Sequence, residues 1–528
     1  MKKKALSILL AAVLVISVPL FATAAAGHNE DTCENVPIIR LAGAMGTLYY
    51  DEFLPTEKPA FEPTTEELTA AVNGVTDKLM SSLLHIPPKW DDMAKALSDM
   101  IWDFAGEIAM DEKGVSVNPL TCEHRVDVNE VLPIDNREVF TQDHTKNRIY
   151  TWTYDWRLDP CDLAAQLHEY IENVKKYSEH SKVNLRAPSG AGMIVTAYLA
   201  AYGSDSLNGI VLCDSVHNGM GLIGQLACKD IAIDSVALSE GHFFDMIGLE
   251  GIQQIGGILL PILQRMGVLS IVAGVGNAAL DKAIDSFYET AVTPMFFHMP
   301  NMWGYVSDEY YVKAKATQFG NDPKYADLVK KIDNYHYNVQ LKADQLLLDA
   351  SNSGVKVALL AYYGNPAVPL VKDARANTDI MVEVAKASGG ATAARFGSTL
   401  GALYVQKIDD GHNHVSIDGQ IDASTCVLPE QTWFIKNVMH SQPFDWRDTF
   451  AQWVFDAPGQ VTVHTSTEYP QFMTYNKKTG VVSALTAESG GFSLLNPISW
   501  LLGIWLKCIN IAVKFGTWWL PLFGIYTN

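Results

Sequence analysis

The sequence has few cysteines, and their spacing excludes the common cysteine-based sites. Seven cysteines occur in 528 residues, and no two form the C-x-x-C pair that zinc and redox motifs use. Because seven is an odd number, at least one has no partner within a monomer, and the pattern predicts no disulfide framework. Cys213 ends the apolar stretch Ile210–Cys213, and we expect it to fill buried space in a strand. The seven are Cys33, Cys122, Cys161, Cys213, Cys228, Cys426 and Cys508.

The chain also lacks excess positive charge, internal repeats and low-complexity segments. Its formal net charge is −20, and no basic tract is interleaved with aromatic residues, which argues against a nucleic-acid partner. No lysine follows the Gly43–Gly46 turn and no G-x-G-x-x-G motif opens a helix, so we expect no nucleotide cofactor. The length allows one large α/β core with insertions, or two domains.

The N-terminal segment has the three parts of a secretory signal peptide. Met1–Lys4 is positively charged, Ala5–Phe21 is apolar, and the small residues that follow offer cleavage at Ala24 or Ala26. We therefore expect residues 1–26 to be removed. The mature protein is then secreted or associated with the cell surface.

Strand-like and helix-like segments alternate along much of the chain. Apolar residues recur at helical spacing over Pro160–Tyr177, where we expect Leu163, Leu167, Tyr170, Ile171 and Val174 to face the core. This alternation predicts an α/β fold with a mostly parallel sheet and crossover helices. The expected strands are Val36–Leu41, Ile149–Trp156, Val183–Pro188, Leu207–Cys213, Val355–Tyr362, Gly401–Ile408 and Thr432–Val438.

One serine lies in the setting of a nucleophile elbow. Ser189 follows the strand-like Val183–Pro188 and precedes the apolar helix-forming run Met193–Leu199, with small residues on both sides. Small residues allow backbone and helix to crowd around a strained serine, whose hydroxyl then stands clear of the sheet. Asp410 and His440 follow downstream, in the chain order Ser, Asp, His.

Four blocks of the sequence form a recognisable set. They are Val36–Thr47, Tyr154–Arg157 (Y-D-W-R), Ala187–Gly192, and Asp409–Gly411 with the later Trp433–Ile435 and His440. Together they resemble the lecithin:cholesterol acyltransferase-like branch of the α/β-hydrolases, in its secreted bacterial form. The resemblance covers residues 36–440 and implies an α/β-hydrolase fold with esterase or lipase activity. The chain departs from the family's G-H-S-M-G-G pattern, because Ala187 and Ala191 replace the two glycines of G-x-S-x-G.

A serine becomes an effective nucleophile when an imidazole removes its proton and a carboxylate orients that imidazole. We expect Ser189 to be the nucleophile. His440 is the best candidate base, because it directly follows the predicted strand Thr432–Val438 at the end of the sheet where the elbow opens.

The acid has three candidates. Asp410 matches the family's D-G position together with Gly411, and we favour it for that reason. Asp409 is adjacent and offers the same chemistry. Asp214 follows the strand after the elbow, where some lipases place the acid.

An oxyanion formed on ester attack needs two preorganised N–H donors. We expect one from Gly190 and the other from Ala44 or Met45 in the glycine-rich turn. His412 and His414 lie beside the Asp409–Asp410 pair and suggest a metal, but nothing in the sequence completes a ligand set. We therefore expect no metal and no cofactor.

The domain map follows from the resemblance and from composition. Where the family has its cap, the alternation of strands and helices lapses and a long apolar stretch begins. The expected units are a signal peptide (1–26), an α/β-hydrolase domain (27–445) with a helical insertion (48–148) and a cap (218–354), a small β appendage (446–488), and an apolar C-terminal helix (489–528). We expect the strands of the appendage at Val461–His464 and Val481–Ala484.

The C-terminal segment Leu494–Ile525 is apolar with one narrow polar stripe that includes Lys507 and Lys514. A transmembrane span would place both lysines in hydrocarbon, at roughly 2.5–3.5 kcal/mol each. A helix in the membrane interface avoids most of this cost, and a helix packed on the protein's own cap avoids all of it. The interface helix and the helix packed on the cap both stay open, and a transmembrane span ranks third.

The sequence thus predicts a serine hydrolase that cleaves carboxylic esters of acyl or lipid type through an acyl-enzyme. Acyl transfer to an alcohol differs only in what attacks that intermediate and stays open. The alternative is a catalytically silent hydrolase-like protein that binds lipid or a cell surface, which the degenerate elbow favours.

Overall fold

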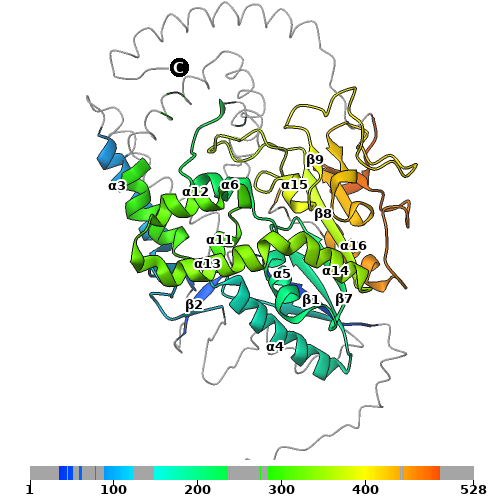
Figure 1. The fold of residues 1–528 in the computed structure, drawn as a ribbon, viewed down its shortest axis with the longest axis horizontal. Helices are drawn as coiled ribbons and strands as arrows, with labels where there is room; N and C mark the ends of the chain where they lie inside the picture. Colours follow the sequence, from blue (N-terminus) through cyan, green and yellow to red (C-terminus); the bar gives the residue numbers. More distant parts are fainter. Residues whose placement is uncertain are drawn as a thin grey trace, which may run out of the picture.

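The computed structural model describes residues 35–43, 46–51, 59–61, 89–122, 148–235, 284–440 and 445–487, with a few isolated positions between them. Its main feature is an eight-stranded sheet in the order β13-β12-β11-β8-β7-β6-β1-β5 (Figure 1). Neighbouring strands run parallel except β12 and β13. The strands are β1 (Ile38–Leu41), β5 (Ile149–Trp152), β6 (Val183–Pro188), β7 (Leu207–Cys213), β8 (Lys356–Tyr363), β11 (Thr432–Lys436), β12 (Phe472–Asn476) and β13 (Val481–Ala484).

Helices lie on both faces of this sheet. On one face α4 (Pro160–Ser178) packs against α5 (Ala191–Tyr202), which in turn contacts α14 (Ala343–Asn352). On the other face α16 (Trp446–Asp456) lies against β7 and β8. The predicted α/β architecture with a mostly parallel sheet is therefore confirmed.

Strand β7 shows why these segments form a doubly covered sheet. Its successive side chains belong to opposite cores: Ile210 and Leu212 pack with α4 and α5, whereas Val211 and Cys213 pack with α16. A strand covered on both faces needs apolar residues at every position rather than at alternate ones. Cys213 is buried, as predicted.

Helix α4 matches its predicted bounds and its predicted buried face. Its start is fixed by the Asp159 side chain, which accepts a hydrogen bond from the Cys161 N–H at 2.9 Å, and by Pro160 in the first turn. It ends where Glu179 adopts the left-handed conformation, with φ 55°. The five residues predicted to face the core are all buried.

A second group of helices lies to one side of the sheet, on the left of Figure 1. Within it, α3 from the expected insertion packs on η4 from the expected cap: Trp102 Nε1 donates to the Thr290 carbonyl at 2.7 Å. The two segments, far apart in sequence, thus contact each other directly. The group comprises α3 (Trp90–Ala105), η4 (Tyr288–Phe297), α11 (Pro300–Gly304), α12 (Asp308–Phe319) and α13 (Ala326–Asn338).

The remaining described elements are short. Two small antiparallel sheets have the orders β3-β2-β4 and β10-β9. Their strands are β2 (Leu48–Tyr50), β3 (Pro59–Phe61), β4 (Leu120–Thr121), β9 (Thr392–Ala393) and β10 (Ile421–Asp422). The short helical segments are η2 (Gly106–Ile108), α6 (Gly221–Ala227), η5 (Pro323–Tyr325), η6 (Gln340–Lys342), α15 (Val384–Ala387), η7 (Ala423–Thr425) and η8 (Pro429–Gln431).

Two strand predictions and one domain boundary need correction. Residues 401–408 form no strand but turns and irregular backbone, with Leu403 and Val405 exposed. Residues 461–464 also form no strand, because Val461 and Val463 are buried against the α16 core as loop residues. The predicted separate appendage at 446–488 is not separate, since β12 pairs with β11 and extends the main sheet. At 461–464 the alternating pattern reflects burial, which loops and strands share, whereas the apolar residues of 401–408 lie on the surface.

The predicted signal peptide (1–26) and C-terminal helix (489–528) lie outside the described residues. Within the part of the chain that the structure describes, no helix is long and apolar enough to cross a membrane.

The Y-D-W-R block contains a buried arginine that links two segments of the chain. The Arg157 side chain is fully buried and pairs with Asp155 in a bidentate contact through one guanidinium edge, Nε to Oδ1 at 2.9 Å and Nη2 to Oδ2 at 2.7 Å. Its Nη1 also donates to the Ile108 carbonyl and the Ser116 hydroxyl. This one side chain therefore connects the end of β5 to the segment that follows α3.

We predict that Arg157→Leu lowers the free energy of unfolding by about 3–5 kcal/mol, because it leaves the Asp155 carboxylate without its partner in a buried site. Urea titration followed by circular dichroism measures the loss. Arg395→Leu is the matched control, since Arg395 pairs with Asp373 on the surface and should cost less than about 1 kcal/mol. Equal losses in the two variants would contradict a structural role for Arg157.

Candidate active site

Ser189 occupies a sharp turn between strand and helix. It follows β6 directly, its φ is 49°, and α5 begins two residues later. Its N–H donates to the Cys213 carbonyl at 3.0 Å, which fixes the turn to the end of β7. A left-handed serine held in this way is the strained conformation expected of a nucleophile elbow.

The small residues around Ser189 show which glycine the turn requires. Ala187 and Ala191 are fully buried without disturbing the strand or the helix, so alanine is tolerated at both degenerate positions. Gly192 is different, because a Cβ built there would lie 1.7 Å from Ser215 Oγ. The close approach of α5 to the end of β7 therefore depends on Gly192.

The structure brings His440 to Ser189, as the sequence predicted. Its Nε2 lies 2.8 Å from Ser189 Oγ, across 251 residues of sequence. His440 follows β11, and its backbone N–H donates to the Asp379 carbonyl at 3.0 Å. The imidazole is thus held at the carboxyl edge of the sheet, where the elbow opens.

Two carboxylates meet the other nitrogen of this imidazole. His440 Nδ1 lies 2.5 Å from Asp379 Oδ2 and 2.9 Å from Asp214 Oδ2. Asp214 directly follows β7 in a left-handed conformation with φ 50°, and both carboxylates are buried. Contact with two acceptors places a proton on Nδ1, which leaves Nε2 free to accept one from the serine.

Asp379 is the better anchored of the two. Its Oδ1 accepts hydrogen bonds from the N–H groups of Met381 and Val382, at 2.9 and 2.7 Å. Its loop is tied to the end of β8 by reciprocal backbone bonds between Asn365 and Thr378. By contrast, Asp214 Oδ1 is buried and has no hydrogen-bond donor among the described residues.

The pKa values of the two carboxyl groups shift in opposite directions. Burial, and then repulsion from Asp379, raise the pKa of Asp214 well above its usual range. Burial also favours the neutral form of Asp379, but the charge of His440 and the N–H of Val382 outweigh it and lower the pKa of that carboxyl. Burial opposes a charged His440, yet the Asp379 charge and the bond to Asp214 raise its pKa. These opposite shifts favour the ionised form of Asp379 and the protonated form of Asp214.

The prediction that Asp410 pairs with His440 is wrong. Asp410 lies in the exposed loop before β10, where it accepts bonds from the His412 N–H at 2.9 Å and from His414 Nε2 at 3.1 Å. These bonds lower the pKa of Asp410 to about 2. A D-G dipeptide also forms a tight turn, and Gly411 has φ 85°, so the match reflects turn chemistry.

Sequence reasoning named Asp214 as a competitor but did not name Asp379. The signal was weak, because Asp379 lies sixteen residues after β8 in an irregular loop (379 − 363). An Asp whose side chain bonds the N–H groups two and three residues later is usual in turns, so the sequence alone offers no reason to single it out.

The predicted oxyanion donors are only partly described. Gly190 precedes α5, at the helix end where N–H groups have no acceptor within the helix, next to Ser189. Ala44 and Met45 lie outside the described residues.

Comparison with known proteins identifies no family. No family profile matches the chain, and no curated protein matches it in sequence. Among solved structures, the chain is similar to one described as the crystal structure of the Tle4–Tli4 complex, with 13% identity, a TM-score of 0.24, and coverage of 62% of this chain and 75% of the other.

We predict that Gly192→Ala lowers the free energy of unfolding by about 1–3 kcal/mol, because the added methyl group overlaps Ser215. In a protein that already carries Ser215→Gly, adding Gly192→Ala should lower the free energy of unfolding less than it does in the wild type. Gly459→Ala is the control, since nothing lies within 4 Å of a Cβ at that position. Thermal unfolding checks all four variants, and a Gly192→Ala protein as stable as Gly459→Ala would contradict the close packing.

Proposed function

We propose that this chain is a serine hydrolase of the α/β-hydrolase fold that cleaves carboxylic esters, with Ser189, His440 and Asp379 as its catalytic triad. The observation that carries the proposal is the continuous contact from Ser189 Oγ to His440 Nε2 and from His440 Nδ1 to Asp379. The chain order Ser, Asp, His and the positions at the ends of β6, β8 and β11 support it.

The reaction follows from these contacts. His440 Nε2 accepts the Ser189 proton while Oγ bonds to the ester carbonyl carbon, and the Gly190 N–H faces the developing oxyanion. His440 then gives the proton to the leaving alkoxide as the ester C–O bond breaks, which leaves an acyl group on Ser189. Water, deprotonated by the same imidazole, releases the acid and restores the serine.

Asp379 stabilises the imidazolium that forms in each step, and Asp214 keeps Asp379 in place. A proton on Asp214 prevents two negative charges from facing each other in a buried site. If an alcohol attacks the acyl-enzyme instead of water, the acyl group is transferred to that alcohol and the enzyme acts as an acyltransferase.

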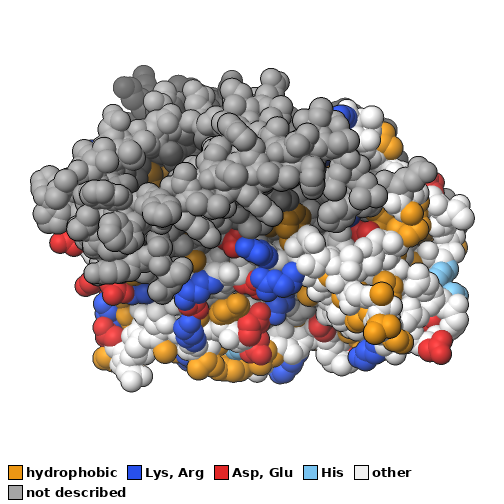
Figure 2. Space-filling model, turned by 90° about the horizontal axis from the view of Figure 1, so that it is seen from above, with side chains coloured by type: hydrophobic (Ala, Val, Ile, Leu, Met, Phe, Trp, Pro, Cys, Tyr) orange, Lys and Arg blue, Asp and Glu red, His pale blue; other side chains and the backbone are white. Residues whose placement is uncertain are grey.

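Substrate, location and partners are proposed from the sequence. The apolar segments favour an acyl or lipid ester, residues 1–26 favour export, and residues 489–528 favour peripheral membrane contact or packing on the cap. Figure 2 shows basic and acidic side chains next to each other on the described part of one face. Acidic and basic residues also form exposed ion pairs, such as Lys313–Asp230 and Arg395–Asp373. We propose no nucleic-acid partner.

We predict that a fluorophosphonate probe labels Ser189, because the probe reacts with serines activated by a neighbouring imidazole. Ser189→Ala should abolish labelling and ester turnover together. Ser353→Ala, which removes a hydroxyl at the opposite, amino end of β8, should change neither. Mass spectrometry locates the label, and a protein that stays unlabelled while a control esterase reacts would favour the silent binder.

We predict that Asp379→Asn lowers kcat by orders of magnitude, roughly 10⁴-fold, because it removes the charge that stabilises the imidazolium. Asp214→Asn should stay within about tenfold of wild type, since a neutral amide replaces a neutral acid. The opposite order would assign the acid to Asp214.

The pH profile distinguishes the two roles further. His440 must be neutral to accept a proton, so kcat/KM should rise with pH through its pKa, which lies above the ordinary 6.5. In Asp379→Asn this acid limb should move to lower pH, because the charge that raises the pKa of His440 is gone.

A further inference from the structure

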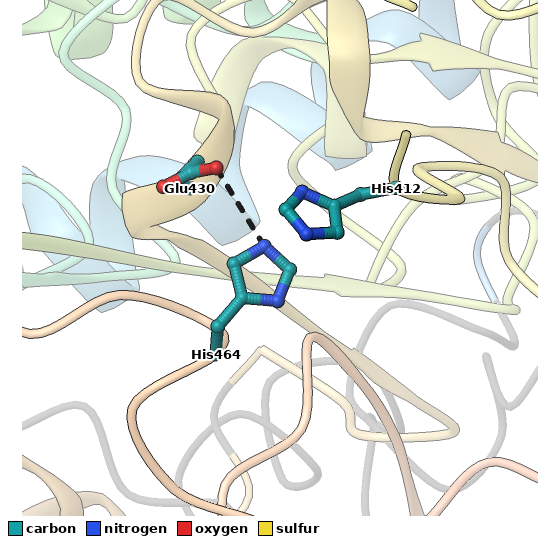
Figure 3. A group of neighbouring side chains, drawn as sticks. All are labelled: His412, Glu430 and His464. Atoms are coloured by element: carbon teal, nitrogen blue, oxygen red, sulfur yellow. Dashed lines mark ion pairs between the residues drawn. The ribbon is translucent and has the colours of Figure 1, made fainter. Parts of the chain in front are cut away.

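Three side chains from distant segments converge outside the candidate active site. His412 lies in the loop before β10, Glu430 in η8, and His464 in the loop after α16. Each offers one ligand atom, and these atoms all lie within 4.8 Å of one another. In Figure 3 the two imidazoles point towards each other below the Glu430 carboxylate. The sequence predicted no metal because nothing near His412 completes a ligand set, and the fold supplies the two missing groups.

The backbone at each of the three residues is fixed. The Val463 N–H donates to the Glu430 carbonyl at 2.8 Å, which ties the segment before His464 to η8. The His412 carbonyl accepts from Gln406 Nε2 at 2.6 Å, and its N–H donates to Asp410. A set held in this way loses little conformational freedom when it binds an ion.

The donor set has the chemistry of a zinc site. Two imidazoles and one carboxylate are preferred ligands of Zn²⁺, whereas Ca²⁺ and Mg²⁺ require mostly oxygen. The side chains are 52%, 40% and 43% exposed for His412, Glu430 and His464, so an ion can reach them from solvent. We propose that His412, Glu430 and His464 bind one Zn²⁺ ion, with water in the fourth position.

Asp410 completes this arrangement as an orienting group. Its Oδ1 lies 3.7 Å from His412 Nδ1, an ion-pair distance that is longer than a hydrogen bond, on the side of the ring away from Nε2. Nε2 of that ring is thus left for the metal, and a small rotation of the ring would bring Nδ1 within hydrogen-bond distance of Asp410. A carboxylate behind a ligating histidine fixes the ring and its tautomer in many zinc sites. The aspartate that the sequence assigned to catalysis is therefore a positioning residue for the metal.

The site lies at the opposite end of β11 from the triad. Glu430 comes directly before β11, and His440 follows the other end of that strand. Zinc at this place joins the loop before β10, the start of β11 and the loop after α16. Its effect is on stability rather than on ester chemistry.

The test uses the full-length protein without an affinity tag, treated with a chelator and then dialysed. Isothermal titration calorimetry with ZnCl₂ should give one bound ion per chain. His412→Gln, Glu430→Gln and His464→Gln should each weaken binding at least about tenfold, and Asp410→Asn by about 10–100-fold. His168→Gln is the matched control, because His168 stacks on Tyr202 of α5 at 4.0 Å, on another element of the fold.

ZnCl₂ should also raise the unfolding midpoint of the wild type but not of His464→Gln, and CaCl₂ or MgCl₂ should raise neither. Absence of saturable zinc binding, or affinity in the three ligand variants equal to that of His168→Gln, would overturn the proposal. Wild-type affinity in Asp410→Asn would overturn the orienting role of that residue. Because these readouts measure the metal, they are independent of whether Ser189 is catalytic.

Discussion

The parallel pairing of β6, β7, β8 and β11 is the constraint on which the candidate active site depends. Parallel strands can be joined only by crossover segments, so their carboxyl ends all lie at one edge of the sheet. Ser189 and Asp214 follow the first two strands, and Asp379 and His440 follow the other two. Ser189, Asp214 and Asp379 therefore meet around the imidazole of His440, although 251 positions separate Ser189 from His440.

Charge decides how these four groups share protons. Two buried carboxyl groups beside one histidine cannot both be ionised at low energy, so one is kept neutral. Asp379 has two backbone N–H donors on its second oxygen, whereas no described residue donates to the second oxygen of Asp214, which favours the negative charge on Asp379. The difference in local hydrogen bonding thus distinguishes two residues that are chemically identical.

Two residues outside the proposed triad have identifiable structural roles. Gly192 allows α5 to approach the end of β7, and the buried Asp155–Arg157 pair joins β5 to the segment after α3. Both were visible in the sequence as motif positions. Their roles are structural, because neither Gly192 nor Arg157 touches His440.

The sequence by itself determined the parallel α/β architecture, the helix over Pro160–Tyr177, the turn at Ser189 and the histidine that meets it, because periodicity and small residues at a turn are local signals. Only the tertiary structure decided which acid serves His440. Asp379 and Asp410 both lie in loops with ordinary turn signals. The paths of these loops place Asp379 at the His440 imidazole and Asp410 beside His412. The tertiary structure likewise brought Glu430 and His464 to His412. Contacts between distant loops depend on packing, so no regular spacing in the sequence predicts them.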